Sequence, residues 1–209
     1  MVPAFLMHHI LLFDYSHPKM THEPALLSYV IDPDDRIIET GGDWDKFALA
    51  NDSPSMISEY VAGRSLWDFV SGDSLQFLYR NIFLQARSGR PFDLDFRCDS
   101  PTERRLMNMK ISGEEGGYVR LVTTTRQIEK RELGISAMVG TKSKEGDVVV
   151  MCSWCNKFRT GPEEWHEIEQ AGQLLGLFTS HTVGPISHGM CDTCYKTLSA
   201  RLASRSHLN

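Results

Sequence analysis

The stretch Cys152-Ser-Trp-Cys155 and its counterpart Cys191-Asp-Thr-Cys194 decide how the C-terminal part of this chain folds. Two cysteines at this spacing can bind one metal ion from a single tight turn, and a second pair completes a tetrahedral shell. The chain contains 5 cysteines, and these pairs hold all of them except Cys98. One such motif is weak evidence, but two in a cysteine-poor chain are strong. We therefore predict a structural zinc site with Cys152, Cys155, Cys191 and Cys194 as its ligands.

Two other interpretations of the four cysteines stay open. They could be dithiol redox switches, although the surrounding pattern lacks the βαβ context of a thioredoxin. They could also be ordinary buried thiols. His188 shortly precedes Cys191 and could replace one thiolate as a ligand. Because four sulfurs already fill a tetrahedron, we expect His188 instead to donate a hydrogen bond to a bound sulfur or to form part of a plain turn.

Residues 148–209 around these motifs are predicted to form a small zinc-stabilised module. The pattern Thr160-Gly-Pro-Glu163 resembles a capping box, which predicts a helix that begins there and has Trp165 on its apolar face. A second helix is predicted from Cys194 to Arg205. A module of about 60 residues is only marginally stabilised by its own hydrophobic core, so bound metal would supply part of its folding free energy.

The preceding residues, 25–130, have the pattern of a larger domain. Its clearest element is a helix over Asp73–Ser88, with apolar residues on one face, Asp73 as the N-terminal cap and Gly89 at the end. The strands after it show alternation of apolar and polar residues, most clearly over Phe92–Cys98. The predicted elements in order are two strands within 27–40, a helix over 43–51, a helical turn over 65–70, the helix over 73–88, and strands over 92–98, 107–111 and 118–125.

This order of elements, with Gly63-Arg-Ser-Leu-Trp-Asp-Phe-Val70 before the long helix, resembles the PAS domain family over roughly residues 25–127. The resemblance implies an α+β fold with a five-stranded antiparallel sheet and flanking helices around a small cavity. It also implies a domain that senses a ligand, light or redox state, or that dimerises. The block over residues 151–198 resembles a C-terminal module carried by many bacterial PAS and response-regulator proteins. The shared pattern is Cys-x-x-Cys followed by Ser-His-Gly-x-Cys-x-x-Cys.

The PAS-like region lacks the residues that usually bind haem or react with flavin. No histidine lies between His22 and His166, so a haem would have no proximal imidazole there. Cys98 falls on a predicted strand, whereas a light-sensing flavin domain needs its reactive cysteine in a helical motif. We expect neither haem nor flavin, and we expect Cys98 to be a small core residue. No catalytic constellation or nucleotide-binding loop is visible, which favours a non-enzymatic protein.

The net charge of −5 disfavours nucleic acid as a partner. The apolar run Phe5–Phe13 is shorter than the roughly 20 residues needed to span a bilayer, and it lacks the features of a signal peptide. We therefore expect a cytoplasmic chain. Residues 1–24 form an N-terminal extension in this prediction, and residues 131–147 form a linker. The extension could precede a start at Met20, or it could be a short dimerisation or interfacial helix. We expect a homodimer that depends on this extension and on the PAS-like sheet, because exposed apolar surface such as Phe5–Phe13 tends to be covered by a partner.

These observations together predict a cytoplasmic regulatory protein. Its PAS-like domain would sense a ligand or dimerise, and its zinc-stabilised module would contact a signalling partner such as a kinase or regulator. The alternative is a thiol-redox sensor in which oxidation of the two cysteine pairs releases zinc.

Overall fold

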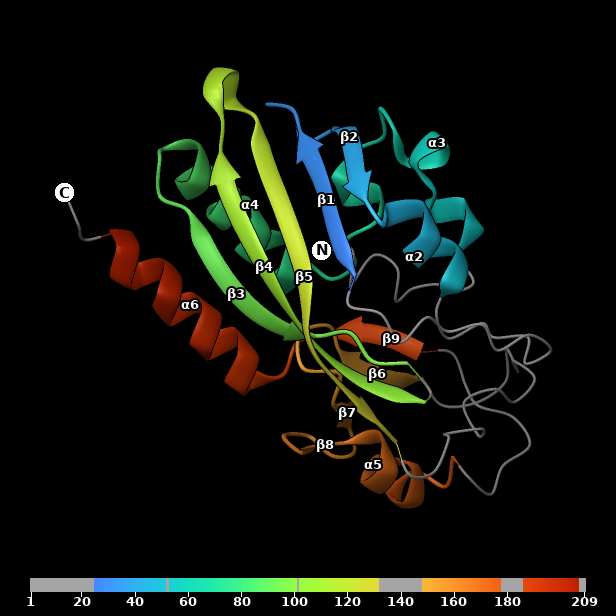
Figure 1. The fold of residues 1–209 in the computed structure, drawn as a ribbon. Coiled ribbons are helices and arrows are strands. Elements are labelled where there is room, and N and C mark those ends of the chain that lie inside the picture. The colour runs from blue at the N-terminus through green and yellow to red at the C-terminus, as the bar shows by residue number, and fades with distance from the viewer. Residues whose placement is uncertain (1–24, 52, 101, 132–147, 178–185, 207–209) are drawn as a thin grey trace.

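The computed structural model describes residues 25–51, 53–100, 102–131, 148–177 and 186–206. The predicted extension over 1–24 and residues 132–147 of the predicted linker lie outside the described residues. Two β-sheets organise the described part, one of five strands and one of four. The smaller sheet lies beyond one end of the larger sheet (Figure 1).

The larger sheet is antiparallel throughout, with the strand order β2-β1-β5-β4-β3. A turn through Gly116 and Gly117, which have φ values of 75° and 82°, joins the two longest strands. The prediction of an α+β fold with a five-stranded antiparallel sheet is confirmed. The strands are β1 (Leu26–Ile31), β2 (Ile37–Gly42), β3 (Phe92–Arg97), β4 (Glu103–Gly113) and β5 (Val119–Lys130).

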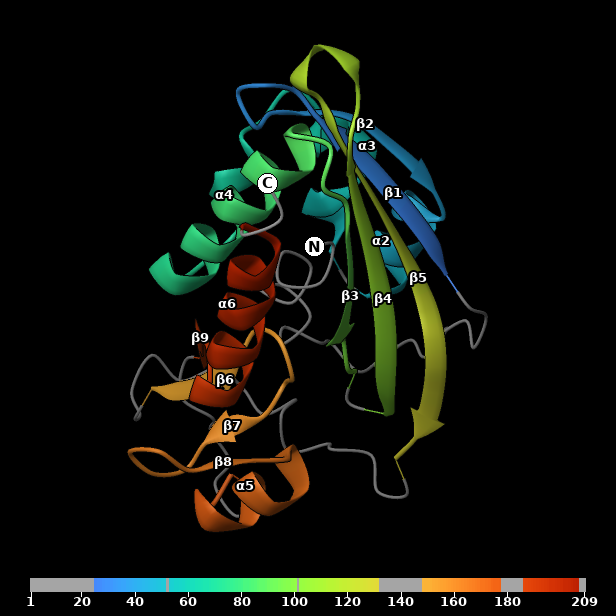
Figure 2. The ribbon, with the colours of Figure 1, turned by 90° about the vertical axis from the view of Figure 1, so that its left-hand side faces the viewer.

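One face of this sheet forms the main core because its strands alternate. In β3, Phe92, Leu94 and Phe96 are buried, whereas Asp93 and Asp95 are exposed. Helices pack on the buried face, and Figure 2 shows one of them, α4, standing on one side of the sheet. The helical segments between β2 and β3 are α2 (Trp44–Ala50), η1 (Pro54–Met56), α3 (Ser58–Val61), η2 (Leu66–Asp68) and α4 (Asp73–Arg87).

Helix α4 presents the apolar stripe that the sequence predicts, but its first residue differs in role. The cap position is Gly72, with a φ of 90°, and Asp73 is the first helical residue. The prediction that Asp73 caps the helix is therefore wrong. Glycine adopts the left-handed conformation that turns the chain into the helix, and the Asp73 carboxylate still lies favourably near the positive end of the helix dipole. The buried residues of α4 are Leu75, Leu78, Tyr79, Ile82, Phe83, Gln85 and Ala86.

The smaller sheet has the order β8-β7-β6-β9, and its β6 and β9 strands are parallel. In that pair Met151 lies opposite His188, and Cys152 lies opposite Gly189. This register brings the first cysteine motif beside the residues that lead into the second. The strands are β6 (Val149–Cys152), β7 (Phe158–Arg159), β8 (Trp165–His166) and β9 (Ile186–Gly189).

Helix α5 (Ile168–Leu174) begins later than the sequence predicts, with Glu167 at the cap position. The prediction that Thr160–Glu163 opens a helix is wrong. Thr160 instead closes the turn between β7 and β8. Its N–H donates to the Glu164 carbonyl at 3.0 Å, and its hydroxyl is 2.7 Å from Nδ1 of His166. Capping-box residues also suit tight turns, and here the neighbouring strand pairing decides between the two.

Helix α6 (Asp192–Ser206) confirms the second predicted helix and packs against α4 on the same side of the larger sheet (Figure 2). Leu198 and Leu202 are buried, and the Gln85 side chain donates to the Leu202 carbonyl at 3.2 Å. Arg201 donates to the Asp93 carbonyl at 3.2 Å. One hydrophobic core therefore extends from the larger sheet into the residues around the smaller one. None of the described helices is long and apolar enough to cross a bilayer.

Candidate metal centre

The structure brings together the four cysteines predicted as ligands. The Sγ atoms of Cys152, Cys155, Cys191 and Cys194 all lie within 4.8 Å of one another. Cys152 ends β6 and Cys155 lies in the turn that follows, whereas Cys191 directly precedes α6 and Cys194 lies in its first turn. Cys152 and Cys191 are buried, and Cys155 and Cys194 are half-buried.

Local backbone geometry forms the first half of this cluster. The Cys152 N–H donates to the Lys157 carbonyl at 2.7 Å, and the Asn156 N–H donates to the Cys152 carbonyl at 3.0 Å. Asn156 has a φ of 60°, a left-handed conformation that asparagine tolerates better than most residues. The chain therefore reverses tightly enough for both thiols of the first motif to face the same point.

The sulfur spacing fits a tetrahedral metal site. Zn–S bonds of about 2.3 Å imply sulfur–sulfur edges of about 3.8 Å in a regular tetrahedron. The Sγ atoms of Cys155 and Cys191 are 3.8 Å apart, and all four residues are free cysteines. The arrangement can therefore hold a metal ion such as zinc.

Hydrogen bonds within the cluster favour negative charge on sulfur. The Cys191 N–H points at Sγ of Cys152 from 3.4 Å, and the Cys194 N–H points at Sγ of Cys191 from 3.5 Å. Hydrogen bonds from the thiols of Cys155 and Cys194 lower the pKa of Cys152 well below the usual thiol range, although burial opposes this. The same bonds raise the pKa values of Cys155 and Cys194, because those thiols hold the protons. A metal ion would take the place of these shared protons.

His188 and Cys98 lie outside the group of four sulfurs. His188 is half-buried in β9, opposite Met151, and its ring is not part of the metal-binding group found among the described residues. Its hydrogen bond to a bound sulfur stays a prediction. Cys98 is fully buried, and burial raises its thiol pKa. The prediction that Cys98 is a small core residue is confirmed.

The residues that join the cysteine cluster to the larger sheet were not predicted from the sequence. Trp154, between the first two cysteines, is only 8% exposed and lies against Tyr79 of α4 and Phe96 of β3. The only indication of this contact in the sequence is a large apolar residue, tryptophan, between the two cysteines, where small polar residues would be enough to form the turn. Asn156, the residue after Cys155, contacts Arg97 and Asp99 at the end of β3 and beyond it, and no pattern in the sequence indicates this contact.

An ion-pair network also links the larger sheet to α5 and to the residue that precedes it. Arg97, at the end of β3, pairs with Asp99 and, at 3.2 Å, with Glu167 ahead of α5. Arg131, just after β5, pairs with Asp99 at 2.7 Å and with Glu169 of α5. The Arg131 side chain is 4% exposed, so it is fixed between the larger sheet and α5. Glu167 and Glu169 therefore meet arginines at the C-terminal ends of β3 and β5, which lie at the same end of the larger sheet.

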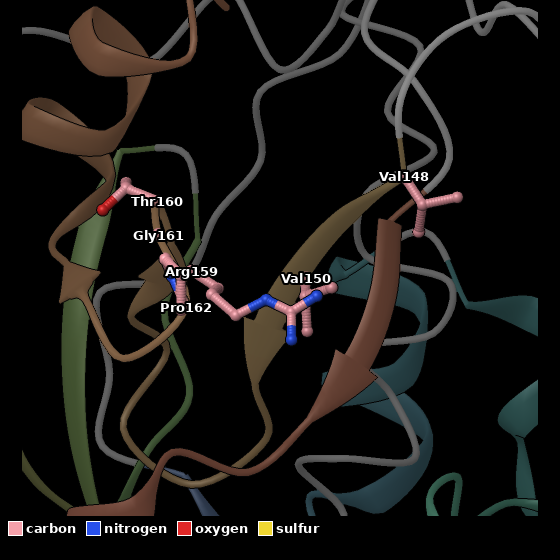
Figure 3. A pocket seen from close by; sticks show the side chains of 6 residues that line it. All are labelled: Val148, Val150, Arg159, Thr160, Gly161 and Pro162. Carbon is pink, nitrogen blue, oxygen red and sulfur yellow. The ribbon is translucent and has the colours of Figure 1, made fainter.

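An open hollow of about 450 Å³ lies beside the smaller sheet (Figure 3). In Figure 3 the Arg159 side chain extends from β7 towards Val150 of β6. None of the four clustered cysteines lines the hollow, so it is separate from the candidate metal centre. Its lining residues are Val148, Val150, Arg159, Thr160, Gly161 and Pro162.

No protein-family model matches this chain, and no curated protein sequence matches it either. The resemblance to PAS domains and to the bacterial C-terminal module therefore stays a prediction. Function must follow from the fold and from the cysteine cluster.

Proposed function

We propose that this chain is a signalling protein in which a PAS-like sensor domain acts together with a zinc-stabilised interaction module. The five-stranded antiparallel sheet with helices on one face supports the first part, since the resemblance implies that architecture. The cluster of four sulfurs supports the second part and is the observation that carries the proposal. The module, residues 148–209, would contact a cytoplasmic partner such as a kinase or regulator.

The donor set favours a structural zinc ion. Thiolate ligands select soft or borderline metals, and four of them in a tetrahedron leave no open position for a substrate or an activated water. When bound, the ion would cross-link β6 to α6 through Cys152, Cys155, Cys191 and Cys194. Such a cross-link stabilises the folded state, because the four thiols are not held together in the unfolded chain.

A thiol-redox sensor is the second candidate, and one observation favours it. Cys155 and Cys194 are half-buried, so a small oxidant can approach one sulfur from each pair. One thiolate would attack a peroxide oxygen and break the O–O bond, which forms a sulfenic acid and releases hydroxide. A second thiolate would displace hydroxide from the sulfenic acid to form a disulfide, and two protons from solvent would convert the two hydroxides to water. With two of its four ligands lost, the zinc ion would leave.

Native mass spectrometry of the reduced protein tests the proposed site. We expect one zinc ion per chain in the unchanged protein and in Cys98→Ser, whose cysteine lies outside the cluster. We expect little or no zinc in Cys191→Ser. Full zinc occupancy in Cys191→Ser, or none in the unchanged protein, would contradict the ligand set.

The same measurement separates the structural site from the redox sensor. Mild peroxide should release zinc in step with a loss of free thiols if the cluster is a sensor. It should leave both zinc and thiol content unchanged on that timescale if the cluster is purely structural.

A further inference from the structure

The turn that carries the first two cysteines is also the surface that docks on the larger sheet. Trp154 lies between the two ligands, and its ring centroid is 5.9 Å from that of Phe96 and 6.5 Å from that of Tyr79. Aromatic pairs at these separations attract each other beyond the effect of burial alone. Because Phe96 lies on β3 and Tyr79 on α4, one indole contacts both layers of the larger domain.

Hydrogen bonds fix this turn to the chain at the end of β3. The Arg97 N–H donates to the Trp154 carbonyl at 2.9 Å. In the amide orientation that satisfies both groups, the Asn156 side chain donates to the Arg97 carbonyl at 2.9 Å and accepts from the Asp99 N–H at 3.2 Å. Three bonds therefore join residues 154–156 to residues 97–99, in addition to the ion pair between Arg97 and Glu167.

The same few residues thus have two tasks. Cys152 and Cys155 must face the metal, while Trp154 and Asn156 must face the sheet. A turn this short has few backbone torsions. The torsions that direct the two cysteines towards the metal therefore also set the direction of Trp154 and Asn156 towards the sheet. If the metal leaves, the two cysteines lose their common anchor, and the orientation of Trp154 is no longer imposed by the cluster.

We propose that metal binding by the cysteine cluster and docking of the turn 152–156 on the larger sheet are coupled. This inference rests on the proposed metal site. Zinc binding stabilises β3 and α4 through Trp154, and any change of the larger domain that disturbs the end of β3 weakens zinc binding. The coupling is reciprocal because both effects describe the same free-energy difference. A change in the larger domain can therefore alter the metal affinity of the cluster, and metal binding can alter the stability of the larger domain.

The sheet order limits how far the effect extends. β3 is an edge strand of the larger sheet, and the β1–β2 hairpin lies at the opposite edge. Loss of metal should loosen β3 and the facing side of α4 first. The hairpin should respond least, since β4 and β5 lie between it and the docking contact.

The first test changes the larger domain and measures the metal. Arg97→Ala removes the ion pairs to Glu167 and Asp99 but leaves every cysteine in place. Arg120→Ala is the matched control, because Arg120 also pairs with two carboxylates, Glu39 and Glu114, at the far side of the sheet. With zinc-loaded, reduced full-length protein and a chromophoric chelator, we expect zinc to dissociate on the order of 10-fold faster from Arg97→Ala than from Arg120→Ala. Equal rates would overturn the proposal.

The second test removes the metal and measures the larger domain. After zinc is stripped with a chelator under reducing conditions, we expect amide hydrogen exchange to rise in residues 92–99, with residues 26–42 almost unchanged. Trp154→Ala should show the faster exchange in residues 92–99 even with zinc bound. Unchanged exchange in 92–99 on zinc removal would refute the coupling while leaving the metal site intact. A chain that binds no zinc would refute the proposed site itself.

Discussion

Replacing Arg131 by methionine tests whether the ion-pair network holds α5 against the larger sheet. The Arg131 side chain is 4% exposed and pairs with Asp99 and Glu169. Methionine keeps much of the side-chain volume and removes only the charge and the donors. The change therefore isolates the electrostatic contribution of this contact from its packing contribution.

The expected loss in the free energy of unfolding depends on the ion pairs that each carboxylate keeps after Arg131 is replaced. Hydrogen bonds to charged groups contribute about 1.5–3 kcal/mol each, and removing one partner of a buried pair costs about 3–5 kcal/mol when the other is left unpaired. Here Asp99 keeps Arg97, and Glu169 keeps Arg104 at 2.9 Å, so neither carboxylate is left alone. We therefore expect Arg131→Met to lower the free energy of unfolding by about 2–3 kcal/mol.

Urea unfolding of the zinc-loaded, reduced protein, followed by circular dichroism, measures this change. Arg126→Met, in the last part of β5, is the control. Arg126 is 51% exposed and pairs with Asp93 and Asp95 at 3.9 and 3.5 Å, so its loss should cost less than about 1 kcal/mol. If Arg131→Met costs no more than Arg126→Met, the network does not stabilise the contact and the reasoning from burial is wrong.

Three further predictions concern the backbone, pH and assembly. Gly42→Ala should lower the free energy of unfolding in urea several-fold more than Gly63→Ala does. Both residues have positive φ, but only a Cβ at Gly42 would clash, because it would lie 2.2 Å from the Leu26 carbonyl oxygen. Similar urea unfolding midpoints for the two variants would contradict this. Burial raises the pKa of Glu169, but a hydrogen bond from its own backbone N–H and the nearby arginines bring it below its usual value of about 4.3. A carboxyl whose pKa is lowered by folding contributes stability that is fully present above its unfolded-state pKa and is lost as the pH falls through its folded-state pKa. Glu169→Gln should therefore flatten the loss of stability in acid, and an unchanged acid profile would contradict this prediction. Deleting residues 1–24 should weaken self-association in light scattering without loss of zinc, and a dimer unchanged by the deletion would remove that segment from the interface.

Local patterns in the sequence determined much of the fold. The alternation in β3 and the apolar stripe of α4 each follow from a period that one element imposes on its own residues. The spacing of the paired cysteines is likewise a local property, because two thiols in one tight turn can face one metal ion. The five-stranded antiparallel sheet followed less directly, through the order of elements and the resemblance that it supports.

Sequence patterns were ambiguous where a neighbouring element decides between two local structures. Thr160–Glu163 fits a capping box, yet the pairing of β7 with β8 uses Thr160 in a turn. Asp73 is a good cap residue, yet Gly72 takes that position because its φ of 90° suits the entry into α4. In both cases the alternatives differ little in local free energy, so packing determines the outcome.

The contact between the cysteine cluster and the larger sheet was decided only by the tertiary structure. Trp154 meets Phe96 and Tyr79, and Arg97 meets Glu167, across long stretches of chain that no periodicity connects. The sequence therefore determined which residues could bind a metal ion, whereas the fold determined what the cysteine cluster touches. The physical reason is that ligand spacing is a property of one turn, while docking depends on how two sheets and a shared core come together.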